Sequence, residues 1–247
     1  MKTHLFKPFR SRQAFTLIEL IVVLTILVGL AGVLVPAVTN MVNRTNRSTS
    51  AVNISEIAGA VQRFEAIYLE YPNNLDSLVT NPVLGTGLNT VYTTLGTVLA
   101  TVTLDANTLA ALNNAGITSV GVHAVDDTTF DAPSAFTLLD TSIIYGPTAA
   151  HQVALGLETT GTLGKYIVLG IGARSELNGT TMVDAPVHFP RDAASNPEVV
   201  YSRFLAIFQI TDGTDALTRA KFVGVIAPDG SGMSTQLDGY YTSTAND

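Results

Sequence analysis

A single carboxylate inside an apolar run is the residue of this sequence with the clearest chemical consequence. Residues 15–38 form a stretch of 24 residues, 18 of them apolar, in which Glu19 is the only charged side chain. A carboxylate within a membrane-spanning helix is costly to insert, so it indicates a charged partner or a functional role. Glu19 also lies near one end of the run, so a solvated carboxylate at headgroup level is the competing interpretation.

The other residues that could do chemistry do not form a catalytic or metal site. The absence of cysteine excludes a disulfide framework, a Cys-based zinc site and a thiol nucleophile. The serines lack a Gly-x-Ser-x-Gly elbow. The histidines have no metal-ligand spacing on one element; they are His4, His123, His151 and His188. We therefore expect no catalytic residue and no bound cofactor or metal, and we expect that the protein is not an enzyme.

Two kinds of glycine-containing loop could in principle bind a ligand, but a simple turn is the favoured interpretation of each. The segment Gly170-Ile171-Gly172 follows a strand-like run, as a dinucleotide loop would, but it lacks the third glycine and a surrounding βαβ pattern. A turn at a strand end is favoured there. The Asp/Gly loops at 212–215 and 229–230 could offer oxygen ligands to Ca²⁺, yet their residues are more typical of β-turns.

The charge distribution indicates a chain that crosses a membrane once. The net charge is −7, which argues against a general nucleic-acid binder. Residues 1–14 nevertheless carry four basic and no acidic side chains, whereas residues 75–247 carry 6 basic and 16 acidic ones. The basic residues before the apolar run predict a cytoplasmic N-terminus and an extracytoplasmic body, although Arg44 and Arg47 reduce the contrast. As a helix, the run would be about 36 Å long, enough for a hydrocarbon core of about 30 Å.

Residues 12–20 resemble the processing site of type IV prepilins and type II secretion pseudopilins: Arg12-Gln13-Ala14-Phe15-Thr16-Leu17-Ile18-Glu19-Leu20. The resemblance implies a leader, residues 1–14, that a prepilin peptidase removes by cutting between Ala14 and Phe15. It also implies N-methylation of Phe15. The family normally has glycine before the cut, and this chain has Ala14, which could slow processing.

The resemblance further implies a structural subunit of a pilus-like or pseudopilus filament. Glu19 would pair with the charged α-amine of an adjacent subunit, and Pro36 occupies a position where many members carry a helix-loosening proline. The implied partners are the prepilin peptidase, an assembly ATPase with its platform protein, and other pilins or pseudopilins. Tyr71-Pro72 is similar to the stretch after the long helix in many major pseudopilins. The sequence does not decide between a pilus and a pseudopilus, or between a major and a minor subunit.

Two alternatives compete with the filament hypothesis. A secretory signal peptide could be cleaved after Val35-Pro36-Ala37, but its apolar region would normally be shorter and free of acid. The helix could also be only an anchor for an extracytoplasmic enzyme or binding domain. In that case Glu19 would be dispensable.

The resemblance implies a leader (1–14). The patterning of the remaining sequence predicts an α+β fold in three parts: a transmembrane helix (15–38), its amphipathic continuation (39–71) and an extracytoplasmic β-rich domain (72–247). Apolar residues recur at helical spacing in the continuation, and Pro72 disfavours helix beyond it; the recurring residues are Ile54, Ile57, Val61, Phe64 and Tyr68. We expect this stripe to pack on an antiparallel sheet, a pilin-like arrangement.

Within the domain, residues 75–103 are expected to be irregular with short strands, and Asp105 is expected to cap a helix through Asn114. Residues 240–247 are expected to be a polar tail. The predicted strands are Ile117–Val125, Phe136–Tyr145, Lys165–Gly172, Val199–Thr211 and Arg219–Ala227.

Overall fold

The structure is a computed structural model that describes residues 16–79, 82–83, 98–122, 134–159, 165–188 and 201–242. It divides into two compact units, Met1–Asn43 and Arg44–Asp247, which are described separately below. Ala14 and Phe15, the residues of the predicted processing site, lie outside the described residues.

One helix, α1, runs from Leu17 to Tyr68. Its 52 residues contain the whole apolar run after Thr16, as the sequence predicts. Pro36 lies inside α1, so it does not end the helix. A bend at Pro36 stays a prediction.

In the second unit, α1 is amphipathic. Its buried side chains lie on one face and are Ser50, Ala51, Ile54, Ile57, Ala60, Val61 and Phe64. The predicted stripe is therefore confirmed up to Phe64. Its extension to Tyr68 is wrong, because that side chain is 53% exposed, although its ring lies 4.5 Å from the Phe64 ring between centroids.

The end of α1 is fixed by its own backbone and by one arginine. Leu69 has a positive φ of 61°, and its N–H donates to the Glu65 carbonyl at 2.8 Å, which is a left-handed C-terminal cap on a residue other than glycine. Arg219 donates to the Leu69 carbonyl at 2.9 Å and forms a 2.8 Å ion pair with Glu65. Its guanidinium also lies over the Tyr71 ring, 4.9 Å from the centroid. Arg219 thus satisfies a carbonyl that the helix leaves without an internal partner.

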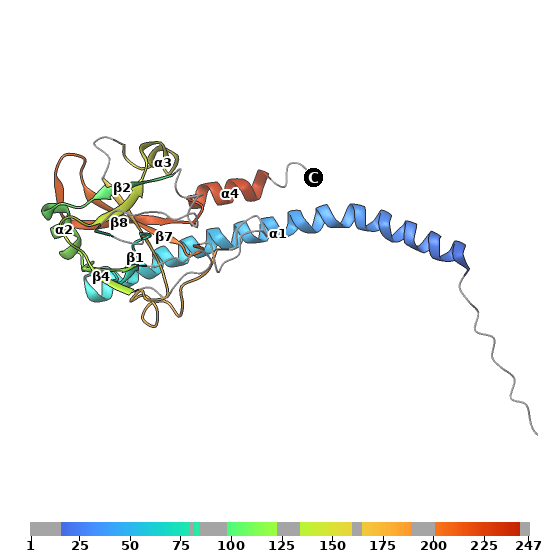
Figure 1. Cartoon of the computed structure of the whole chain (residues 1–247), viewed down its shortest axis with the longest axis horizontal. Helices are drawn as coiled ribbons and strands as arrows, with labels where there is room; N and C mark the ends of the chain where they lie inside the picture. The colour runs from blue at the N-terminus through green and yellow to red at the C-terminus, as the bar shows by residue number, and fades with distance from the viewer. Residues whose placement is uncertain are drawn as a thin grey trace, which may run out of the picture. The chain divides into compact units, whose positions relative to one another are not determined.

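The described strands form one sheet in the order β2-β5-β6-β1-β3-β4, with β7 paired to β6 and β8 paired to β7. Figure 1 labels β1, β2, β4, β7 and β8 in the body of the second unit. Their bounds are β1 Leu75–Asp76, β2 Leu99–Thr103, β3 Ser119–Val122, β4 Ser134–Thr137, β5 Ile143–Pro147, β6 Tyr166–Gly170, β7 Leu205–Thr211 and β8 Ala216–Ile226.

The sheet is mixed and mostly antiparallel, so the expectation of an antiparallel sheet holds for all but one of the described strand pairs. β1 pairs with β3 in parallel, through Leu75 with Val120 and Asp76 with Gly121, while the other strand pairs described are antiparallel. A parallel pair needs a long crossover, and the chain between β1 and β3, which contains β2 and α2 (Ala106–Asn113), supplies it. The α+β class is confirmed.

Both faces of the central strands are buried. Alternate residues point to opposite faces of a strand, so the side chains of β6 and β7 are shared between two cores. Ile167 and Phe208 belong to the core on the α1 side, together with Ile57 and Val61. Val168 and Ile207 belong to a second core, against which Leu155, just after α3 (Ala149–Ala154), is packed. This explains why β6 is a continuous run of buried residues instead of an alternating one.

The short helices agree only partly with the sequence-based expectations. Asp105 caps α2 as predicted, accepting from the backbone N–H groups of Asn107 at 3.0 Å and Thr108 at 2.7 Å. The predicted strand Phe136–Tyr145 is instead two strands, β4 and β5, separated by a turn. The prediction of a polar tail is wrong for residues 240–242, because α4 spans Met233–Thr242.

Candidate functional site

Glu19 lies in the first turn of α1 and is bound to Thr16. The Glu19 carboxylate accepts from the Thr16 backbone N–H at 2.8 Å and from the Thr16 hydroxyl at 2.9 Å. In return the Glu19 N–H donates to the Thr16 hydroxyl oxygen at 3.4 Å. This reciprocal pattern is a capping box, which satisfies backbone donors at the start of a helix.

Thr16 is therefore a residue of the site that sequence reasoning missed. The signal was present, because Thr16-x-x-Glu19 directly before an apolar run is the sequence pattern of a capping box. The capping box gives Glu19 a local role in addition to the predicted one. Its carboxylate can hold the helix start, and the same negative charge stays available to a cation from outside the chain.

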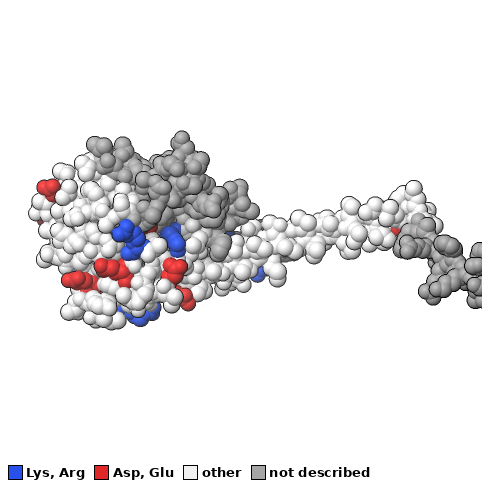
Figure 2. All heavy atoms as spheres, turned by 60° about the horizontal axis from the view of Figure 1, so that its bottom comes forward, with Lys and Arg blue, Asp and Glu red and all other residues white. Residues whose placement is uncertain are grey.

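The apolar part of α1 presents its large side chains to the outside. The large apolar side chains from Leu17 to Val42 are each about half exposed or more. Exposed apolar surface of this extent is not stable in water and marks a membrane or protein contact. Figure 2 shows the described part of this apolar segment as an almost uniformly uncharged surface on the face in view. By its length and composition, α1 is able to cross a membrane.

Two threonine hydroxyls, one inside the apolar run and one directly after it, are satisfied within the helix. The hydroxyls of Thr25 and Thr39 donate to the carbonyls of Ile21 and Val35, at 2.8 and 2.9 Å. Such bonds to the preceding turn remove the cost of placing a hydroxyl in hydrocarbon.

Gly170 at the end of β6 and Gly172 just after it are explained by close packing instead of phosphate binding. Asp76 is 1% exposed, and the Tyr201 hydroxyl donates to its Oδ2 at 2.7 Å. A side chain at Gly170 would collide with the Tyr201 hydroxyl, and one at Gly172 would collide with the Asp76 carboxylate. Glycine is required at both positions because this buried pair lies against the backbone.

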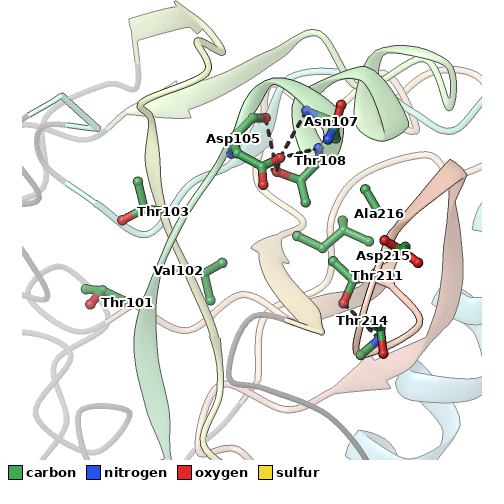
Figure 3. A pocket seen from close by; sticks show the side chains of 12 residues that line it. Thr101, Val102, Thr103, Asp105, Asn107, Thr108, Thr211, Thr214, Asp215 and Ala216 are labelled. Atoms are coloured by element: carbon green, nitrogen blue, oxygen red, sulfur yellow. Dashed lines mark hydrogen bonds between the residues drawn. The ribbon is translucent and has the colours of Figure 1, made fainter.

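A polar hollow of about 330 Å³ lies between β2, the start of α2 and the β7–β8 turn. Figure 3 shows Asp105 and Asn107 on one side, Thr101 and Thr103 on another, and Thr214 and Asp215 on a third. The lining is rich in oxygen, but the Asp105 Oδ1 atom is engaged in capping α2. The hollow therefore offers a polar surface that includes the carboxylates of Asp105 and Asp215.

The two Asp/Gly loops use their first aspartate to hold a turn. Asp212 Oδ1 accepts from the N–H groups of Thr214 and Asp215, both at 2.8 Å. Asp229 Oδ1 accepts from the Ser231 N–H at 2.8 Å. These bonds are the side-chain turns that Asp favours. Among the described residues, no group of three or more His, Cys, Asp or Glu side chains could hold a metal ion.

The two described histidines lie near Asp229, and one of them contacts α1. His188 is buried, and its Nδ1 atom is 2.8 Å from the hydroxyl of Ser50 on α1. Burial lowers the pKa of His188 below its ordinary value of 6.5, and the charge of Asp229 offsets part of this effect. Burial also lowers the pKa of His151, which Asp229 and a Gly230 backbone group partly offset.

These shifts predict a loss of stability on mild acidification. Between the lowered pKa values and 6.5 the unfolded chain binds more protons than the folded one, so the free energy of unfolding falls as the pH falls through 6.5. We expect the full chain in detergent to melt at a lower temperature at about pH 5.5 than at about pH 7.5. In a His151→Gln/His188→Gln variant this difference should vanish, and an unchanged pH dependence would contradict the prediction. Asp105 and Asp212 do not contribute to the difference between about pH 5.5 and about pH 7.5. Backbone hydrogen bonds lower the pKa values of both carboxyl groups, so they titrate below this pH range.

No protein-family model, curated protein or solved structure matches the chain. The class of the protein is therefore set by its own features. It is an α+β protein in which a long N-terminal helix precedes a mixed, mostly antiparallel sheet, and that helix is long and apolar enough to span a membrane.

Proposed function

We propose that the chain is a structural subunit of a type IV pilus-like or type II secretion pseudopilus filament. The observation that carries this proposal is the combination of the Ala14-Phe15-Thr16-Leu17-Ile18-Glu19 motif with an exposed apolar helix that begins at Leu17. In this proposal a prepilin peptidase cuts between Ala14 and Phe15 and methylates Phe15. The new α-amine is then the cation for the Glu19 carboxylate of a neighbouring subunit.

The energetic logic depends on both charges being present. An ion pair in a low-dielectric helix bundle is stable only when each charge has its partner, and removing one leaves the other uncompensated. Before cleavage the subunit is held in the inner membrane, with its N-terminus in the cytoplasm and its C-terminal domain on the extracytoplasmic side. The assembly ATPase and platform protein then move it into the filament, in which α1 forms the inner part.

The experiment that tests the proposal is the mass of the mature protein. The full chain is expressed with and without a prepilin peptidase, and its intact mass and N-terminal sequence are measured. We expect loss of residues 1–14 and gain of one methyl group only when the peptidase is present. The Ala14→Gly variant restores the residue usual in the family and serves as the matched control for slow cleavage.

The outcomes separate the alternatives. If both the native protein and the Ala14→Gly variant still begin at Met1, the proposal is contradicted. In that case α1 would be only an anchor for an extracytoplasmic domain. A mature protein that begins at Val38 identifies a secretory signal peptide instead.

A further inference from the structure

A pocket of about 450 Å³ lies beside the end of α1, and its lining combines aromatic rings with carboxylates. Its residues are Phe64, Tyr68, Glu70, Glu176, Asn178 and Thr180, and it is here named the Tyr68 pocket. The two rings come from α1 and lie 4.5 Å apart between centroids. Glu70 comes two residues after α1, whereas residues 176–180 belong to the chain between β6 and β7.

The wall formed by residues 176–180 is held in place by hydrogen bonds. Glu176 Oε2 accepts from the Asn73 N–H at 3.0 Å, and the Glu176 N–H donates to the Asn73 carbonyl at 3.3 Å. Next to Thr180, the Thr181 hydroxyl donates to the Ala60 carbonyl on α1 at 3.1 Å. Because both ends of this wall are tied to α1 or to the residues just after it, a ligand that enters the pocket does not have to order it.

The ring of Tyr68 and both carboxylates can be reached from solvent. Tyr68 is 53% exposed, while its neighbour Phe64 is buried. Glu70 and Glu176 are exposed as well. The stem of Glu70 packs closely over Gly116, where a side chain would come within 2.7 Å of the Glu70 Cβ atom. One hollow therefore presents an accessible aromatic ring together with two carboxylates.

This set of groups fits a cation, and a guanidinium best of all. The face of an aromatic ring attracts a cation, and a carboxylate binds one through charge-assisted hydrogen bonds. A guanidinium can do both at once, because its plane stacks on a ring while its N–H groups donate to carboxylates. The chain already holds one guanidinium in this way. Arg219 pairs with Glu65 at 2.8 Å and lies over the Tyr71 ring, 4.9 Å from the centroid.

The charge of the second unit indicates where such a guanidinium comes from. Residues 44–247 carry 19 acidic and 9 basic side chains, a net charge of −10. Two copies of this unit therefore repel each other, whereas a basic segment of a different protein is attracted. Arginine is also enriched in protein–protein interfaces. A basic partner protein is thus favoured over a second copy.

We propose that the Tyr68 pocket binds an arginine side chain of a basic partner protein, with the guanidinium on the Tyr68 ring and its N–H groups donating to Glu70 and Glu176. The pocket lies wholly within the second unit. The proposal therefore depends neither on membrane insertion of α1 nor on cleavage or filament assembly.

A short peptide tests the proposal. The probe is a glycine-arginine-glycine peptide with blocked ends, added at low salt to the full chain in a non-ionic detergent, and the backbone amide shifts are followed by NMR. We expect saturable shifts confined to residues 64–70 and 176–180. A matched peptide with citrulline keeps the shape of arginine without its charge, and it should bind at least about tenfold more weakly.

Three variants keep the test specific. Glu70→Gln/Glu176→Gln removes both charges but keeps the oxygen that accepts from the Asn73 N–H, and it should weaken peptide binding at least about tenfold. Tyr68→Leu should weaken it by about threefold. The matched control is Glu56→Gln/Asp238→Asn, which removes two exposed charges outside the pocket and should bind the peptide like the native chain.

Unchanged amide shifts in β6 and β7 show that the variants are folded. The proposal is overturned if the citrulline peptide binds the native chain equally well, or if Glu70→Gln/Glu176→Gln keeps the native affinity. It is also overturned if both double variants lose binding alike, which assigns the attraction to the acidic body as a whole. Shifts of the same residues that grow with protein concentration without peptide overturn it too, and assign the pocket to a contact between copies.

Discussion

Glu19→Gln is expected to abolish incorporation into filaments while leaving membrane insertion and cleavage intact. Glutamine removes the negative charge but keeps an oxygen that can accept from the Thr16 N–H, so the capping box at the start of α1 is preserved. The α-amine of the neighbouring subunit would then lose its counter-charge in a low-dielectric surrounding, which costs several kcal/mol per unpaired ion. The measurement is the amount of protein in sheared surface fibres against the amount in the membrane fraction.

Two further variants separate the charge from the cap. Thr16→Val removes the hydroxyl partner and keeps the carboxylate, so it should weaken the helix start by about 1 kcal/mol and still allow assembly. Glu19→Ala removes both functions and should assemble no better than Glu19→Gln. If Glu19→Gln assembles normally and Glu19→Ala does not, the residue acts only as a helix cap, and the intersubunit pair is wrong.

Phe208→Ala is expected to be the most destabilising single truncation in the body. Phe208 is fully buried on β7, and its ring meets Tyr71 at 5.4 Å and Phe222 at 5.7 Å between centroids. Truncating a buried phenylalanine to alanine costs about 3–5 kcal/mol, because transfer energy is lost and a cavity stays behind. Since domains are typically stable by only about 5–15 kcal/mol, the variant should lie close to its unfolding transition.

Urea unfolding of the full chain in detergent, followed by tyrosine fluorescence, measures this effect. Tyr71 lies beside Phe208, and the chain has no tryptophan to mask its signal. Lys221→Ala is the matched control, because Lys221 pairs with Gln209 of the same hairpin but is exposed. Its stability should change by less than about 0.5 kcal/mol. Similar losses in both variants would mean that Phe208 is not part of the core.

Features that depend on local chemistry could be predicted from the sequence. Asp105 was predicted as a helix cap because its side chain bonds only to the next few residues. The buried stripe of α1 from Ile54 to Phe64 follows from helical spacing alone. The capping box of Thr16 and Glu19 is equally local, because both residues lie within one helical turn.

Features that depend on distant parts of the chain could not be predicted. The parallel pairing of β1 with β3 involves a strand of two residues, which has no periodicity of its own. The segment 240–242 has the composition of a polar tail, and its place in α4 beside Arg44 and Arg47 is set by residues nearly 200 positions away. The break between β4 and β5 could not be predicted either. It depends on a turn in which the Ser142 hydroxyl oxygen accepts from the Leu139 N–H at 2.9 Å.

Arg219 has a mechanical consequence. It joins Glu65 and the Leu69 carbonyl at the end of α1 to β8, whose Phe222 N–H also donates to the Tyr71 hydroxyl at 3.1 Å. Tension applied along the long helix therefore reaches the hairpin of β7 and β8 directly, through several parallel bonds. The connection from Tyr71 to Asn74 adds bonds of its own, because Asn73 Oδ1 accepts from the N–H groups of Thr118 and Ser119 at 3.1 and 2.9 Å, so the load is shared between this connection and β8.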